Sequence, residues 1–221
     1  MKIGGDKMKS PRTKVEVDGL EAKYYDFFMD FLTFGYYRRF INDAIRFMKI
    51  KKQDKILDLG SGTGRNACIM RKYLDDAGEI IGIDISDIML KKSQKRCKNY
   101  KNVHFKKIRI EEEIPYENYF DKVFISFVLH GFEQEDREKI LKNVAKVLKP
   151  GGEFFILDYS NAGEEEIQGI YKIFLSKIEC PLAYEYVLLD QEKFLSLYGF
   201  SNFTYNYFFF KRVNLLRALK D

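Results

Sequence analysis

The pattern of hydrophobic and polar positions changes once along the chain. From Leu20 to Lys49, apolar and aromatic residues recur at helical spacing, and Gly35 is expected to split this stretch into two helices. From Lys51 onward, short apolar runs typical of buried strands alternate with helical patterns. This alternation predicts an α/β fold with a mostly parallel sheet and helices on both of its faces.

Five strands and three helices between them can be placed along this alternation. The strands are expected at residues 55–59, 79–84, 103–108, 120–127 and 153–158. The helices are expected at 65–74, 88–97 and 134–148, and Lys149-Pro150-Gly151-Gly152 is a stop signal for the last one.

After these strands the alternation is interrupted and then resumes. Residues 161–187 form an insertion that we expect to shape a substrate pocket, and Asp190 is placed as the cap of a helix that ends at Gly199. Residues 203–218 predict an antiparallel hairpin with a turn near Phe210 and Lys211. The complete sheet is therefore expected to have seven strands.

The length of the chain favours one domain with small additions. Its 221 residues are enough for one full-sized core. Residues 1–19 are rich in Lys and contain Pro11 and several glycines, which predicts a flexible tail. We expect residues 20–50 to form a helical lid and residues 51–221 to form the main domain, with the insertion at about 161–187.

The composition excludes several classes of protein. Charged residues make up 32% of the chain and hydrophobic residues 46%, which excludes disorder over most of its length. The net charge of +5 is a small surplus of 38 basic over 33 acidic residues, so nucleic-acid binding is not strongly indicated. No export signal or membrane-spanning run is present, and a cytoplasmic location is expected.

The three cysteines are far apart in the sequence. Cys68, Cys97 and Cys180 do not have metal-ligand spacing, and their number is odd. Neither a disulfide framework nor a zinc or other metal site is therefore expected.

The segment from Asp58 to Gly64 is a glycine-rich loop between a strand and a helix. Glycines at such a place allow a ligand to approach the backbone at the amino end of the helix, so a nucleotide-like ligand is indicated. The loop also satisfies the dinucleotide pattern Gly-x-Gly-x-x-Ala, with Asp84 about 20 residues later. A nicotinamide-dependent oxidoreductase is therefore the rival interpretation.

Two carboxylates distinguish these interpretations. Asp58 stands near the end of the first strand, where it would oppose a pyrophosphate but attract a cationic part of a ligand. Asp84 ends the second strand, where its oxygens can accept hydrogen bonds from ribose hydroxyls. Both residues are expected at the carboxyl edge of the sheet, which is where such folds bind ligands.

Four segments with independent motifs resemble the class I S-adenosylmethionine-dependent methyltransferases over about residues 20–219. They are Ile56–Gly64, Gly82–Leu90, Ile114–Asp121 and Leu148–Gly152. Within that class, residues 25–39 and Asp158-Tyr159-Ser160 resemble the ubiquinone/menaquinone biosynthesis C-methyltransferases. The resemblance implies a Rossmann-like fold and transfer of a methyl group from S-adenosylmethionine, which becomes S-adenosylhomocysteine, to a small apolar or aromatic acceptor.

The resemblance also implies which residues bind the cofactor. Thr63 and the glycines would line the methionine part, Asp84 would hold the ribose, Met89 would pack near the adenine and Ser126 would lie under the sulfonium. The family has Asp or Asn followed by Ala where this chain has Ile110-Glu111, so Glu111 or Glu112 is expected to replace the missing acceptor. The whole predicted set is Asp58, Gly60, Ser61, Gly62, Thr63, Gly64, Asp84, Ile85, Met89, Ile110, Glu111 and Ser126.

His130 and Tyr25 are the candidate catalytic residues. The C-methyltransferases carry Arg-Asn where this chain has His130-Gly131. A neutral imidazole there could take a proton from an attacking hydroxyl or amine; the alternative is that His130 bonds a backbone carbonyl and only shapes the pocket. Tyr25 belongs to the lid. The lid aromatics expected to close over the cofactor with it are Tyr24, Phe28, Tyr36 and Tyr37. The aromatics of the insertion expected to form the acceptor pocket are Tyr171, Phe174, Tyr184 and Tyr186.

Other functions remain as alternatives. Lysines between Lys91 and Lys107 allow an RNA methyltransferase, and the segment Tyr207–Arg212 allows a lipid methyltransferase that rests peripherally on a membrane. A non-catalytic nucleotide-binding protein is a further alternative. The expected partner is a small-molecule methyl acceptor, and the expected oligomeric state is a monomer or a homodimer.

Overall fold

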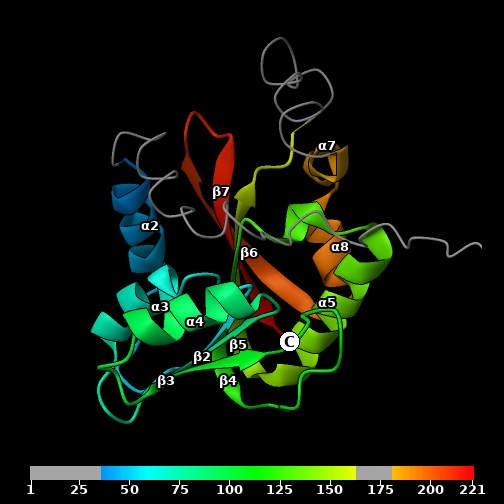
Figure 1. Cartoon of the computed structure of the whole chain (residues 1–221). Helices are drawn as coiled ribbons and strands as arrows, with labels where there is room; N and C mark the ends of the chain where they lie inside the picture. Colours follow the sequence, from blue (N-terminus) through cyan, green and yellow to red (C-terminus); the bar gives the residue numbers. More distant parts are fainter. Residues whose placement is uncertain (1–35, 163–180) are drawn as a thin grey trace, which may run out of the picture.

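The computed structural model describes residues 36–162 and 181–221, which form a seven-stranded sheet with helices on both faces (Figure 1). The strand order is β3-β2-β1-β4-β5-β7-β6. Strands β1 to β5 are parallel, and β7 runs antiparallel to both of its neighbours, β5 and β6. The strands are β1 (Lys55–Leu59), β2 (Glu79–Asp84), β3 (Val103–Lys107), β4 (Phe120–Ser126), β5 (Leu148–Tyr159), β6 (Phe200–Phe208) and β7 (Val213–Lys220).

The alternation of side chains along the strands supplies a hydrophobic core on each face. On β1, Ile56 joins one core, while Leu57 and Leu59 join the other. Residues of α2 and α3 fill the first core together with Cys97 at the end of α4, and residues of α5 and α8 fill the second. The helices are α2 (Tyr36–Phe47), α3 (Arg65–Met70), α4 (Asp87–Arg96), α5 (Gln134–Val147), α7 (Pro181–Leu188) and α8 (Gln191–Ser196).

Most of the expected elements are confirmed, including the complete sheet and its antiparallel hairpin. The expected bounds of β1 and β2 agree with the structure, and the Asp190 side chain caps α8 by accepting a hydrogen bond from the N–H of Lys193. The expectation for β5 was wrong at its start. β5 begins at Leu148, because Leu148 pairs with Phe120 of β4, and an irregularity follows before Glu153 pairs with Lys122. The tail at 1–19 and most of the lid lie outside the described residues.

The β6–β7 hairpin exposes aromatic side chains at its tip. Phe210 is fully exposed, and Tyr207 and Phe209 are half-exposed. The ammonium of Lys211 lies 5.8 Å from the centre of the Tyr207 ring. Exposed aromatic rings beside a cation are compatible with peripheral membrane contact, which stays a prediction. Within the described ranges, the helices are too short or too polar to cross a bilayer.

Cys68 and Cys97 form a disulfide bond, which corrects the expectation that the cysteines are unpaired. The two residues are 29 positions apart, and their Cα atoms are 6.1 Å apart. The helices α3 and α4 lie side by side on one face of the sheet (Figure 1), and this brings the cysteines together. The contact depends on helix packing, so cysteine spacing did not predict it. Cys180 lies outside the described residues.

Reduction of this disulfide is expected to destabilise the protein. A cross-link that closes a loop of about 30 residues restricts the unfolded chain and stabilises the fold by about 3–4 kcal/mol. The variant with Cys68→Ser and Cys97→Ser should lose that much unfolding free energy in urea titrations followed by circular dichroism. Dithiothreitol should destabilise the wild-type protein and leave the variant unchanged. Equal unfolding free energies for oxidised and reduced wild-type protein would contradict the prediction.

Candidate functional site

The glycine-rich loop joins β1 to α3 at the carboxyl edge of the sheet. Gly60, Gly62 and Gly64 have φ angles of 66°, 50° and 73°, which residues with a Cβ rarely adopt. A Cβ on Gly60 would lie 2.7 Å from Val128 Cγ2, and one on Gly64 would lie 2.8 Å from Ser93 Cβ. At Gly62 none of the described residues comes within 4 Å of that position. The loop is packed closely at both ends and open at Gly62, where a ligand can approach its backbone.

The carboxylate of Asp84 holds the open part of the loop. Its Oδ2 accepts a hydrogen bond from the N–H of Gly62 at 2.8 Å, and its Oδ1 accepts one from the N–H of Ser86 at 2.9 Å. Burial raises the pKa of Asp84, while these backbone donors oppose the rise. Each carboxylate oxygen can accept a further hydrogen bond. Asp84 can therefore hold the loop and also bind hydroxyl groups of a ligand.

Asp58 is a buried carboxyl group with incomplete hydrogen bonding. Its side chain is 1% exposed, and its Oδ2 has no hydrogen-bond partner among the described residues. Burial, and in addition repulsion from Asp84, raises the pKa of Asp58 to about 8. A cation bound beside Asp58 would pair with the carboxylate and favour its ionised form.

An open cavity of about 880 Å³ lies beside the end of β2. Its lining consists of Ile85, Lys107, Ile108, Arg109, Glu112, Glu113 and Pro115. Two predicted cofactor residues are placed elsewhere. Ile110 is buried in the hydrophobic core, and the Glu111 carboxylate pairs with Arg109 at 2.6 Å. Of the two glutamates considered as replacement acceptors, Glu112 is the one that lines the cavity.

The other predicted cofactor residues lie in or around the glycine loop. Ser126, at the end of β4, accepts a hydrogen bond from Asn66 Nδ2 at 2.9 Å. Met89 is buried in the first turn of α4. Ser61 and Thr63 are also buried. The structure thus brings the ends of β1, β2 and β4 together around one loop.

His130, which follows β4, and Asp158, at the carboxyl end of β5, form a buried pair. His130 Nδ1 lies 2.7 Å from Asp158 Oδ1, and the backbone N–H of His130 donates to Asp158 Oδ2 at 3.2 Å. A carboxylate that accepts the Nδ1 proton fixes the imidazole tautomer in which Nε2 carries the lone pair. The pair has the arrangement of a general base and the group that orients it.

Arg137 and Tyr186 support this pair. The guanidinium of Arg137 donates to the carbonyl oxygens of Leu129 at 3.2 Å and His130 at 3.0 Å, and it lies 5.2 Å from the centre of the Tyr186 ring. Burial, and then repulsion from Asp158, raises the pKa of Tyr186 well above its usual value. Tyr186 therefore keeps its proton, and its buried hydroxyl has no hydrogen-bond partner in the part of the chain that the structure describes.

Several of the predicted lid and acceptor-pocket residues lie outside the described residues, among them Tyr25, the second candidate catalytic residue. Also outside the described residues are Tyr24, Phe28, Tyr171 and Phe174. The side chains of Tyr36 and Tyr37 are likewise not described. Sequence reasoning missed Asp158 as the partner of His130. The signal was present, because the carboxyl ends of two adjacent parallel strands meet at one edge of the sheet, and Asp158 stands at the end of one of them.

Comparisons with known proteins agree with the fold and the loop. Residues 50–193, more than half of the chain, match a family described as a methyltransferase domain. The chain is 32% identical over 177 residues to the ubiquinone/menaquinone biosynthesis C-methyltransferase UbiE of Pasteurella multocida. The matched region covers 78% of this chain and 65% of that protein. UbiE of Wigglesworthia glossinidia brevipalpis is 33% identical over 154 residues, with 68% and 60% covered.

Solved structures show the same fold at lower sequence identity. A SAM dependent methyltransferase from Aquifex aeolicus has a TM-score of 0.55 and 20% identity, with 80% of this chain and 89% of that chain covered. The curated relatives above are longer proteins, and this chain spans 60 to 65% of their length.

The buried carboxyl group of Asp58 leads to a prediction about stability and pH. A carboxyl whose pKa is higher in the folded state than in the unfolded state destabilises the fold as pH rises between the two values, here from about 4 to about 8. Asp58→Asn removes this cost. Its stability relative to wild type should therefore rise by about 1.4 kcal/mol per pH unit in that range.

Urea titrations of both ligand-free proteins at several pH values measure this difference. Asp76→Asn, at a fully exposed carboxylate, is the control and should show little pH dependence. A constant difference between Asp58→Asn and wild type from pH 5 to pH 8 would mean that Asp58 titrates normally.

Proposed function

This chain belongs to the family of class I S-adenosylmethionine-dependent methyltransferases, and from that premise we propose that it transfers a methyl group from S-adenosylmethionine to a small apolar or aromatic acceptor. The observation that carries the proposal is the buried carboxyl group of Asp58, whose Oδ2 has no partner in the described part of the chain. A cationic ligand would supply that partner.

The residues of the loop fit this cofactor. The amino group of its methionine part is the cation that Asp58 would pair with, and the exposed backbone at Gly62 allows the ligand to lie against the loop. Asp84, already oriented by two backbone N–H groups, would accept hydrogen bonds from the ribose hydroxyls. The cavity lined by Ile85 and Glu112 would take the adenine. When bound, the cofactor supplies a methyl group made electrophilic by its sulfonium.

The contribution of the protein to the reaction is to orient the acceptor, exclude water and remove one proton. We assign the removal of this proton to His130. Asp158 accepts the Nδ1 proton of His130, so the lone pair on Nε2 is the group that takes a proton from the acceptor. The Asp158 carboxylate then stabilises the imidazolium that forms. Buried Tyr186 and Arg137 keep this end of the site fixed.

This assignment defines the class of acceptor. A general base is useful when the nucleophile is formed by loss of a proton, as in a phenol, an enol or an amine. The curated relatives are named as C-methyltransferases of ubiquinone and menaquinone biosynthesis, which supports a hydroxylated aromatic acceptor. His130 replaces the Arg-Asn expected in that family, so the acceptor is proposed by class only.

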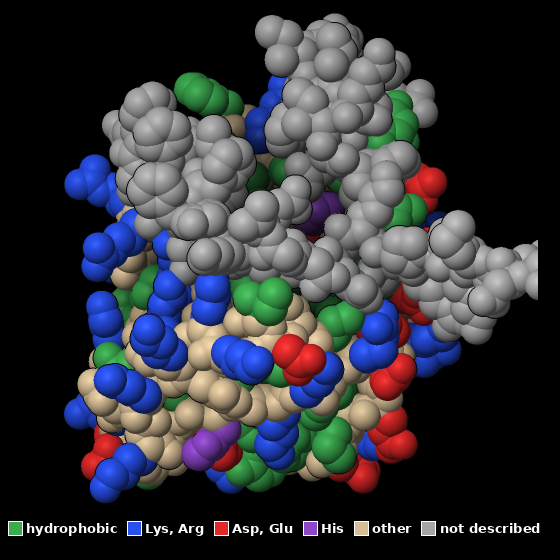
Figure 2. All heavy atoms as spheres, in the orientation of Figure 1, with side chains coloured by type: hydrophobic (Ala, Val, Ile, Leu, Met, Phe, Trp, Pro, Cys, Tyr) green, Lys and Arg blue, Asp and Glu red, His purple; other side chains and the backbone are tan. Residues whose placement is uncertain are grey.

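The alternative functions lack a comparable observation. Figure 2 shows Lys and Arg side chains over the face that α3 and α4 form. Lys107, at the end of β3, pairs with Asp87 in the first turn of α4 at 2.7 Å, and Lys106 lies 4.9 Å from the centre of the Tyr116 ring. Charges dispersed in this way are typical of a solvated face. The matching family model and the two curated relatives reported above are described as methyltransferases, which does not favour a nicotinamide enzyme.

Binding of S-adenosylhomocysteine should release a proton from Asp58. At pH 7 a carboxyl group with a pKa of about 8 is mostly protonated, and pairing with the ammonium group of the ligand ionises it. Calorimetry in two buffers of different ionisation enthalpy should detect the release of most of one proton per ligand. Asp58→Asn should abolish this release and weaken binding by roughly 30-fold or more, because it removes one partner of a buried ion pair. Asp58→Ala should not bind measurably.

The control for this experiment is Asp76→Asn, which should bind as wild type does. Tight binding by Asp58→Asn with an unchanged proton release would refute the role of Asp58. Binding of a nicotinamide dinucleotide but not of S-adenosylhomocysteine by the wild-type protein would refute the proposed function.

Replacement of His130 should affect catalysis rather than cofactor binding. With the phenol, hydroquinone or aromatic amine that the wild-type protein methylates fastest, His130→Gln should lower kcat by roughly 10²- to 10⁴-fold. The KM for S-adenosylmethionine should stay unchanged. A general base that becomes protonated lowers kcat at acid pH, and this decrease should be absent from the variant. His104→Gln, at the exposed histidine on β3, is the matched control. A His130→Gln variant with wild-type kcat and pH profile would show that His130 only shapes the pocket.

A further inference from the structure

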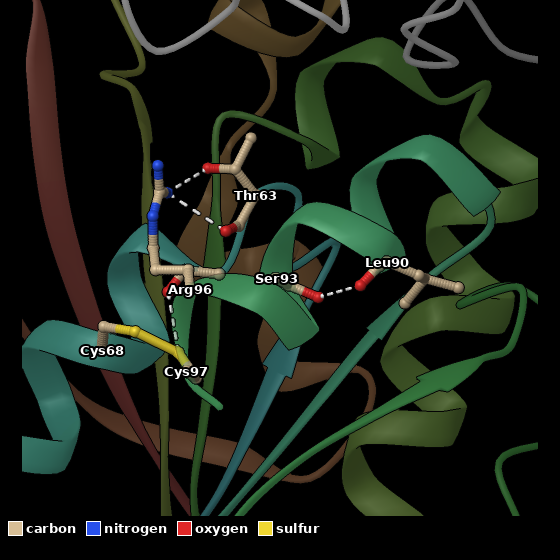
Figure 3. The surroundings of a disulfide bond; sticks show 7 residues. Thr63, Cys68, Leu90, Ser93, Arg96 and Cys97 are labelled. Carbon is tan, nitrogen blue, oxygen red and sulfur yellow. Dashed lines mark hydrogen bonds between the residues drawn. A yellow bond between two sulfur atoms is a disulfide. The ribbon is translucent and has the colours of Figure 1, made fainter. Parts of the chain in front are cut away.

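The carboxyl end of α4 contacts the glycine loop through an arginine (Figure 3). Arg96 Nη1 donates a hydrogen bond to the carbonyl oxygen of Thr63 at 3.1 Å and lies 2.6 Å from the Thr63 hydroxyl oxygen. Thr63 stands between Gly62, which is open to a ligand, and Gly64, which is packed against α4. One guanidinium therefore fixes both the backbone and the side chain of the residue next to the open position.

The disulfide bond is a second link between the same elements. Cys97 follows Arg96 directly, and its bond to Cys68 ties the end of α4 to α3, the helix that begins just after the loop. Cys97 Sγ also lies 3.7 Å from the carbonyl oxygen of Gly64. That carbonyl accepts the N–H of Cys68 at 3.0 Å in the first turn of α3. The two links thus hold Thr63 and Gly64 from one side.

The composition of the loop explains why such links matter for a ligand. Three glycines at positive φ give the loop many alternative conformations, and a ligand that needs one of them must bear the entropic cost of selecting it. Asp84 fixes Gly62 from the side of β2, and Arg96 fixes Thr63 from the side of α4. Preorganisation by both groups lowers that cost and raises affinity.

We propose that Arg96 is a positioning residue for the cofactor, and that the Cys68–Cys97 disulfide keeps Arg96 within reach of Thr63. The inference rests on the proposed function for the identity of the cofactor. Reduction by a dithiol transfers two electrons and two protons to the bond, gives two thiols and converts the reagent to a disulfide. The freed end of α4 then holds the loop less firmly, and cofactor affinity falls.

Two measurements on the full chain test this inference. Amide hydrogen exchange of residues 60–66 in the ligand-free protein reports the order of the loop directly. Calorimetry with S-adenosylhomocysteine reports affinity. The proteins to compare are oxidised wild type, wild type reduced with dithiothreitol, the double variant with Cys68→Ser and Cys97→Ser, Arg96→Ala, Arg96→Lys, and Lys95→Ala as the matched control at an exposed neighbour.

Arg96→Ala is expected to speed exchange in residues 60–66 and to raise the Kd roughly tenfold, which corresponds to the loss of hydrogen bonds from a charged group. Arg96→Lys should recover part of the affinity, and Lys95→Ala should match wild type. Reduction and the double cysteine variant should speed exchange of the same loop amides. Exchange in β1, β4 and β5 should stay close to wild type in Arg96→Ala, and it should rise after loss of the disulfide because the global stability falls.

The outcomes separate the inference from the proposed function. Loop exchange and affinity in Arg96→Ala equal to those of wild type would overturn the role of Arg96. Loop exchange and affinity unaffected by reduction would overturn the role of the disulfide. Wild-type protein that fails to bind S-adenosylhomocysteine would overturn the proposed function and the cofactor assignment with it, while the exchange data would still show whether the loop is held by α4.

Discussion

The site depends on the parallel pairing of β1 with β2 on one side and with β4 on the other. This register places Asp58 opposite Gly82 and Phe124, so the ends of the three strands meet at one edge. Because successive side chains of a strand point to opposite faces, a slip of one residue in β1 would exchange its buried positions and displace Asp58 from the glycine loop. The same logic extends to β5, which brings Asp158 to His130. The positions of the predicted cofactor residues and of the proposed base therefore follow from one sheet register.

The glycine loop shows a balance between stability and binding. Asp58 is buried near a second carboxylate, and its raised pKa means that the ionised form is disfavoured in the ligand-free fold. A buried carboxyl of this kind destabilises the fold, and pairing with a cationic ligand would offset that destabilisation. Ligand binding is favoured by groups that order the loop before any ligand arrives, namely Asp84, Arg96 and the Cys68–Cys97 bond. We therefore propose that binding affinity depends both on the buried Asp58 carboxyl, which a cationic ligand would ionise, and on a preorganised backbone.

Local patterns were sufficient for the strands and for the loop between them. The bounds of β1 and β2 could be read from apolar runs that end at the glycines and at Asp84, since both strands are buried on both faces. The start of β5 could not, because Pro150 and two glycines are typical of a turn, and only the pairing of Leu148 with Phe120 of β4 starts the strand before them. Contacts between elements were the least predictable. The meeting of Cys68 with Cys97 and of Arg96 with Thr63 depends on how α3 packs beside α4. The pairing of His130 with Asp158 could have been predicted from the order of the strands, although the sequence alone left the role of His130 open.

The most direct test of this account is the titration of the Asp58 carboxyl group itself. The ¹³C chemical shift of that carboxyl can be followed by NMR from about pH 4 to pH 10, with and without S-adenosylhomocysteine. We expect a midpoint near pH 8 in the ligand-free protein, and a carboxylate already ionised at pH 7 in the complex. A midpoint near pH 4 in the free protein, or a titration that the ligand leaves unchanged, would contradict the central role given to Asp58.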